Sequence, residues 1–109
     1  MKILERCTQR VKSGKFNEFI AMEKKFDAAE VKLGNVPPKK RFWIRYGGRP
    51  SDTYVWEREW ENMEALEANA ARIWNDPEWN LLLEEAAEIF FDGQSELYTS
   101  FTWDDLPGS

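Results

Sequence analysis

At 109 residues, 32% of them charged and 42% hydrophobic, the chain is long enough for one domain and too short for two, so we expect residues 1–109 to fold as a single domain without a disulfide or a metal. Its net charge of −5 argues against a nucleic-acid partner, which needs a basic surface, and no run of about 18 apolar residues predicts a membrane span. The absence of His excludes His-ligated zinc, haem held by a proximal His and Ser-His or Cys-His pairs, so no metal or cofactor is expected.

The first half of the chain predicts a strand, a helix and a second strand. Residues 3–11 are typical of a strand covered on both faces, and Ser13-Gly14 follows as a turn. Residues 15–33 carry apolar side chains at helical spacing, and Gly34 and Pro37-Pro38 end that helix. Residues 40–46 alternate in the manner of a strand.

The second half predicts the same order of strand, helix and strand, with its helix in two segments. Residues 47–52 are rich in turn formers, and residues 54–60 form a third strand, so the second and third strands make a hairpin. A helix capped by Asn62 carries Trp74 on its apolar stripe, and Asp76-Pro77 begins another helical segment that buries Trp79. A turn at Asp92-Gly93, a strand over 95–101 and a tail over 102–109 complete the chain.

The order β-α-β-β-α-β predicts an α+β, ferredoxin-like fold, with helices on one face of a four-stranded antiparallel sheet. The strands carry large side chains in both parities, such as Trp43 beside Phe42 and Val55 beside Trp56. A monomer would therefore expose an apolar sheet face, which soluble monomers rarely do. We expect that face to pack on the same face of a second copy, giving a homodimer with enclosed cavities.

Four segments resemble the dimeric α/β-barrel superfamily, and NIPSNAP-type proteins within it. The segment Glu5–Gly14 is similar to the opening Glu-x-Arg-Thr-Tyr-x-Leu-Lys-x-Gly: Glu5, Thr8, Lys12 and Gly14 agree, whereas Cys7 and Gln9 depart. Val55-Trp56 and Asp76-Pro77-Glu78-Trp79 are the second match. The stretch from Glu59 to Leu66 resembles the strand-to-helix junction of small monooxygenases in the superfamily.

The resemblance implies a ferredoxin-like dimer. Members of the superfamily include cofactor-independent monooxygenases, haem-degrading enzymes, isomerases and proteins of unknown activity, and NIPSNAP-like bacterial proteins have no settled chemistry. The haem-degrading branch uses an axial His, which this chain lacks.

Charged residues on the predicted strands are the first candidates for a ligand site. Arg6, Arg45 and Arg58 could contact an anionic or carbonyl-bearing ligand, or could pair with neighbouring carboxylates. Arg58 shares its parity with Trp56 and Trp60, so it could hold a planar ligand or stack as a structural cation–π pair. Glu5 could be a buried partner for an Arg or a base in the pocket.

Aromatic residues on the strands are the second group. They could line a pocket, or they could belong to the core and a dimer interface; they are Trp43, Tyr54, Trp56, Trp60 and Tyr98. Cys7 has no His partner and is expected to act as a small buried hydrophobe, and a single Cys is typical of a cytoplasmic protein.

Three functions follow from these patterns. The first is a cytoplasmic homodimer that binds a small apolar or aromatic molecule with a polar end, near Trp56 and Trp60 and oriented by Arg58 or Arg6. The second is a cofactor-independent monooxygenase, in which Arg and aromatic N–H or O–H groups stabilise a substrate carbanion. The third is a non-enzymatic dimeric module whose acidic helices dock a partner.

Overall fold

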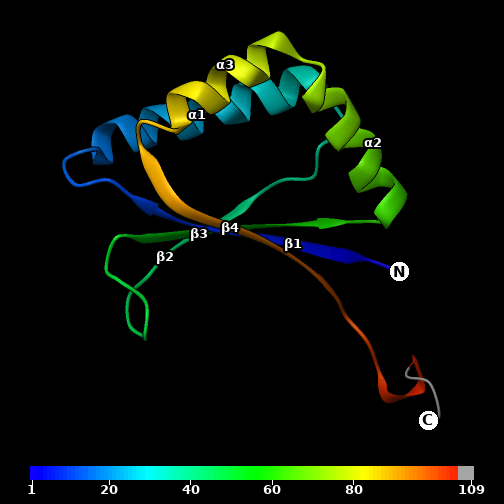
Figure 1. Ribbon diagram of the computed structural model, residues 1–109. Coiled ribbons are helices and arrows are strands. Elements are labelled where there is room, and N and C mark those ends of the chain that lie inside the picture. Colours follow the sequence, from blue (N-terminus) through cyan, green and yellow to red (C-terminus); the bar gives the residue numbers. More distant parts are fainter. Residues whose placement is uncertain (106–109) are drawn as a thin grey trace.

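A computed structural model describes residues 1–105 and confirms the ferredoxin-like α+β fold (Figure 1). The predicted tail is described only as far as Asp105, where Trp103–Asp105 form a short 3-10 helix; residues 106–109 lie outside the described residues. The elements in chain order are β1 (Ile3–Val11), α1 (Phe16–Leu33), β2 (Lys40–Trp43), β3 (Thr53–Trp60), α2 (Met63–Trp74), α3 (Pro77–Ala86) and β4 (Phe90–Thr99).

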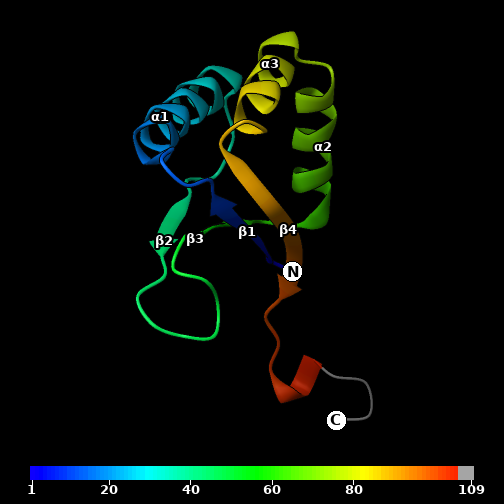
Figure 2. The same cartoon turned by 60° about the vertical axis from the view of Figure 1, so that its left-hand side comes forward.

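The strands form one antiparallel sheet in the order β2-β3-β1-β4, and α1, α2 and α3 all cover the same face of it (Figures 1 and 2). The two central strands, β1 and β3, pair Glu5 with Arg58 and Cys7 with Trp56. Because side chains alternate along a strand, these residues share the helix-covered face. The centre of that face is where a cavity could be enclosed.

The helix boundaries follow from local capping. The Asn62 side chain accepts a hydrogen bond from the backbone N–H of Ala65 at 2.8 Å, and Asp76 caps α3, where Pro77 occupies the first turn. Gly34 ends α1 with φ of +78°, a conformation that costs glycine little. None of the helices in the described part of the chain is long and apolar enough to cross a bilayer.

The core lies between the sheet and the helices and is built from aromatic rings. Phe19 of α1 packs against Tyr54 and Phe90, with ring centroids 4.7 and 5.7 Å apart. Phe26, two turns further along α1, packs against Trp79 of α3 at 5.4 Å. The Phe19 contacts attach α1 to the sheet and the Phe26 contact attaches α3 to α1, because buried aromatic pairs dominate core energetics.

Three predicted details are wrong. The second strand ends at Trp43 rather than at Tyr46, because the chain leaves the sheet edge for a glycine-rich loop. Asp92-Gly93 is not a turn: β4 already begins at Phe90, and Asp92, with φ of +53°, lies where the pairing with β1 shifts register as in a β-bulge. Trp74, predicted to pack, is 81% exposed at the end of α2.

The sheet face without helices is more polar than the sequence predicted. The large rings of β3 and Trp43 of β2 point to the helices, and the open face instead carries Arg6, which donates to Glu57 at 2.6 Å. Arg6 also lies over the Tyr98 ring at 5.0 Å, and Tyr98 donates to Glu96 at 2.7 Å. Phe42, Val55 and Leu4 lie among these charges, so the face is mixed rather than apolar.

Candidate functional site

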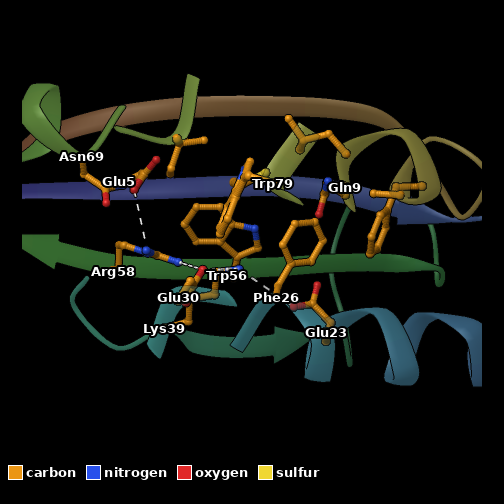
Figure 3. Close-up of a pocket in the computed structure, with 15 residues that line it drawn as sticks. Glu5, Gln9, Glu23, Phe26, Glu30, Lys39, Trp56, Arg58, Asn69 and Trp79 are labelled. Atoms are coloured by element: carbon orange, nitrogen blue, oxygen red, sulfur yellow. Dashed lines mark hydrogen bonds and ion pairs between the residues drawn. The ribbon is translucent and has the colours of Figure 1, made fainter. Parts of the chain in front are cut away.

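A cavity of about 260 Å³ lies between the sheet and the helices (Figure 3). Every helix and three strands contribute to it, together with Lys39 just before β2. Its lining residues are Glu5, Cys7, Gln9, Glu23, Phe26, Glu30, Lys39, Trp56, Arg58, Asn69, Ile73, Trp79, Leu83, Ala86 and Phe90. The cavity therefore has an aromatic part and a charged part.

A buried ionic triad forms one wall of the charged part. Arg58 Nη2 donates to Glu30 Oε1 at 2.5 Å, and Lys39 Nζ lies 3.2 Å from the same oxygen. The Arg58 and Lys39 side chains are only 4% and 5% exposed, and Glu30 is 10% exposed. Charges buried this deeply persist only when paired, so Glu30 holds the two cations in place.

A second ionic cluster continues the wall towards the edge of the sheet. Arg41 Nη2 donates to Glu23 at 3.1 Å and to Asp27 at 2.7 Å, and its Nε donates to the Tyr54 hydroxyl oxygen at 3.1 Å. Burial, reinforced by the Glu23 carboxylate, raises the pKa of the Tyr54 phenol far above its ordinary value. Tyr54 therefore stays neutral and serves as a structural partner of Arg41.

Arg58 lies between two indole rings. Its guanidinium carbon is 5.0 Å from the centre of the Trp56 ring and 6.0 Å from that of Trp60. The Trp60 indole N–H donates to Glu5 Oε1 at 2.9 Å, and Arg58 Nε lies 4.0 Å from that oxygen. Arg58 Nε is buried and has no hydrogen-bond partner, which is unusual for a buried N–H.

The remaining wall is apolar and belongs mainly to the helices. Phe26 and Trp79 pack against each other there, and Ile73, Leu83, Ala86 and Phe90 complete it. Cys7 lines the cavity from β1, and burial raises the pKa of its thiol above the ordinary value. The thiol is thus protonated at neutral pH and contributes as a small hydrophobic group.

The structure brings part of the predicted site together. Glu5, Trp56 and Arg58 line the cavity, and Trp60 is buried beside them. Tyr54 is buried in the core, and Trp43 packs on α1 against Phe16 and Phe19, each at 5.8 Å, so these two rings are part of the packing around the site.

Three predicted site residues lie away from the cavity. Arg6 and Tyr98 are on the opposite face of the sheet, because their strand parity is the reverse of that of Glu5 and Arg58. Arg45 is exposed in the loop that follows β2, since the strand ends before it.

Three charged residues of the cavity were missed from the sequence: Glu23, Glu30 and Lys39. A signal for two of them was present, because Glu23 and Glu30 fall at helical spacing with Phe19 and Phe26, on the stripe predicted to be buried. A carboxylate on such a stripe needs a cation. Among residues 1–105, no group of three or more Cys, Asp or Glu side chains is arranged to hold a metal ion.

Solved structures share this fold, although no family model and no curated protein matches the sequence. A NIPSNAP family protein from Agrobacterium tumefaciens is 12% identical with a TM-score of 0.78, covering 97% of this chain and 99% of that one. A NIPSNAP-like domain protein from Burkholderia xenovorans is 15% identical with a TM-score of 0.74, covering 94% and 87%. SnoaB, a cofactor-independent oxygenase from Streptomyces nogalater, is 13% identical with a TM-score of 0.70, covering 93% and 94%.

These matches confirm the resemblance found in the sequence, since NIPSNAP-family and monooxygenase structures are both among them. At 11–17% identity the likeness shows the fold and nothing finer. Any function of this chain must be argued from its own cavity.

Proposed function

We propose that this protein binds a small aromatic or apolar molecule with a polar end in the cavity between the sheet and the helices. The observation that carries the proposal is the buried Arg58, which is stacked on Trp56 and keeps one N–H without a partner at the cavity wall. A cavity that joins apolar walls to a few fixed polar groups is the usual form of a small-molecule site.

The size of the cavity limits the ligand. An apolar cavity of about 150 Å³ accepts benzene, so a cavity of about 260 Å³ has room for one substituted ring or two fused rings. The aromatic part would lie against Trp56, Phe26 and Trp79, and the polar end would face Arg58 and Glu5 (Figure 3).

Native mass spectrometry of the freshly purified protein tests the proposal first, because it reports retained ligands and the number of chains together. Calorimetric titration with one-ring and two-ring aromatics tests it independently. A ligand that binds with one site per chain supports the proposal, and the absence of binding across the whole set contradicts it.

The pair Trp56→Ala and Trp74→Ala locates the site. If Trp56 is mainly a cavity wall, its replacement abolishes ligand binding and costs less than about 1 kcal/mol of unfolding free energy. If Trp56 is mainly core, the cost is about 3–5 kcal/mol. Trp74 is exposed, so its replacement leaves both binding and stability unchanged.

A cofactor-independent oxygenase is the alternative that the sequence resemblance raised. SnoaB is such an oxygenase and shares this fold, but no contact in the cavity favours a reaction with dioxygen over simple binding. Oxygen uptake with a quinol- or anthrone-like substrate, and its loss in Arg58→Ala, would show that the protein is an oxygenase and that the reaction takes place in this cavity.

We also propose that the protein works as a cytoplasmic homodimer that pairs through its open sheet face. The support is the mixed surface of that face, where Phe42 and Tyr98 are exposed beside ion pairs that are already satisfied within one chain. The single free Cys is typical of a reducing compartment. A monomer in native mass spectrometry, at micromolar protein, would contradict the pairing. Cell fractionation tests the compartment.

A further inference from the structure

We infer that the polar end of the ligand is an uncharged hydroxyl group, held between Arg58 and Glu5. This inference rests on the proposed function and specifies which class of aromatic molecule the cavity takes: phenols or alcohols, rather than carboxylates, amines or ethers.

The distance between the two side chains carries the inference. Arg58 Nε and Glu5 Oε1 are 4.0 Å apart, too far for a direct hydrogen bond. One oxygen atom placed beside the line between them can be within hydrogen-bond distance of both, and a polar gap longer than about 3.5 Å is one that a bridging oxygen can fill. Both residues line the cavity, so a ligand supplies this oxygen once a small movement of the Arg58 side chain opens its buried Nε to the cavity.

The chemistry of the two groups selects a hydroxyl. Arg58 Nε–H can only donate and has no partner, whereas the Glu5 carboxylate can only accept. Glu5 accepts a hydrogen bond from Trp60 and retains further acceptor capacity. A hydroxyl both accepts and donates, so it satisfies the two groups at once; an ether or carbonyl oxygen satisfies only Arg58.

The charges around the gap exclude an ionic ligand. Each of the three glutamates at the cavity already has a cation: Glu5 has Arg58 at 4.0 Å, Glu30 has Lys39 at 3.2 Å, and Glu23 has Arg41 at 3.1 Å. A ligand carboxylate would lie beside Glu5 without a free counter-charge, and a ligand ammonium would lie beside Arg58. Burying an unpaired ion is far more costly than burying a hydroxyl.

Calorimetric titration with three naphthalenes of similar size tests the inference: 2-naphthol, 2-methoxynaphthalene and 2-naphthoate at neutral pH. We expect 2-naphthol to bind about tenfold or more tightly than either of the others, as for a hydrogen bond to a charged group. An ether that binds as well as the naphthol, which would mean that water alone fills the gap, overturns the inference. So does a preference for the naphthoate.

Two variants locate the effect. Glu5→Gln turns Oε1, the oxygen that accepts from Trp60 and faces the gap, from a charged acceptor into a neutral one. The preference for 2-naphthol over its methyl ether should therefore shrink by about threefold or more without vanishing, because a hydrogen bond to a charged group is the stronger kind. Glu57→Gln makes the same change on the opposite face of the sheet and should leave the preference intact. An undiminished preference in folded Glu5→Gln overturns the assignment to Glu5, and the ranking on the unaltered protein stands as a test even if that variant does not fold.

Failure of the inference differs from failure of the proposed function. If none of the three compounds binds, the binding function itself is contradicted. If all bind without preference for the hydroxyl, the cavity is a binding site and only its selectivity has been assigned wrongly.

Discussion

Replacing Glu30 with Gln tests the buried ionic triad at the cavity wall. Glu30 accepts from Arg58 at 2.5 Å and lies 3.2 Å from Lys39. Neutralising it leaves two buried cations whose next carboxylates are Glu5, 4.0 Å from Arg58, and Glu23, 3.9 Å from Lys39. Breaking a buried ion pair from one side costs about 3–5 kcal/mol. That is a large part of the roughly 5–15 kcal/mol that stabilises a typical domain.

Urea unfolding monitored by tryptophan fluorescence measures the loss, and the melting temperature should fall by about 12 °C or more. Glu78→Gln is the matched control, because Glu78 lies 3.1 Å from Lys32 in a pair that is more than half exposed. An exposed pair contributes about 0–1 kcal/mol. If Glu30→Gln costs no more than Glu78→Gln, then water reaches the triad and the argument from burial is refuted.

Two further outcomes follow from the core. Phe19→Ala should lower the free energy of unfolding by about 3–5 kcal/mol, whereas Phe16→Ala, at a ring that is 54% exposed, should change it by less than about 1 kcal/mol in the same denaturant titration. The free energy of unfolding should fall as pH rises above about 10, because burial raises the pKa of Tyr54 and the unfolded chain then loses a proton that the folded chain keeps. Tyr54→Phe should reduce this dependence of stability on pH in unfolding curves measured between pH 8 and 11. An unchanged dependence in the variant would contradict the assignment to Tyr54.

Local signals accounted for most of the fold. The Asn62 and Asp76-Pro77 starts of α2 and α3 and the Gly34 end of α1 depend on residues close in sequence, and all three are present in the structure. The boundaries of β2 and β4 were missed because they depend on pairing across the sheet. Asp92-Gly93 has the composition of a turn, yet it lies within β4, where it forms a bulge opposite β1.

The candidate site was predicted most directly where one strand contained it. Trp56, Arg58 and Trp60 alternate on β3, so their common face could be inferred from the sequence. Which face of β1 joined them depended on register, and this is why Glu5 lies in the cavity and Arg6 does not. Lys39 was missed because its carboxylate partners belong to α1 and become neighbours only when the helix packs on the sheet.

The two carboxylates of α1 also fix where the helix sits along the sheet. Glu23 and Glu30 are two turns apart, about 10 Å along the axis. Each has a cation of its own, Arg41 for Glu23 and Arg58 for Glu30, and Lys39 lies between the two carboxylates at 3.9 and 3.2 Å. Phe19 and Phe26 alone would tolerate a slide of one turn, since other apolar side chains could replace their contacts. The same slide would carry both carboxylates about 5 Å from their cations. The ion pairs thus fix the position of α1 along the sheet. A chimaera that exchanges α1 for another helix must keep a glutamate at both positions.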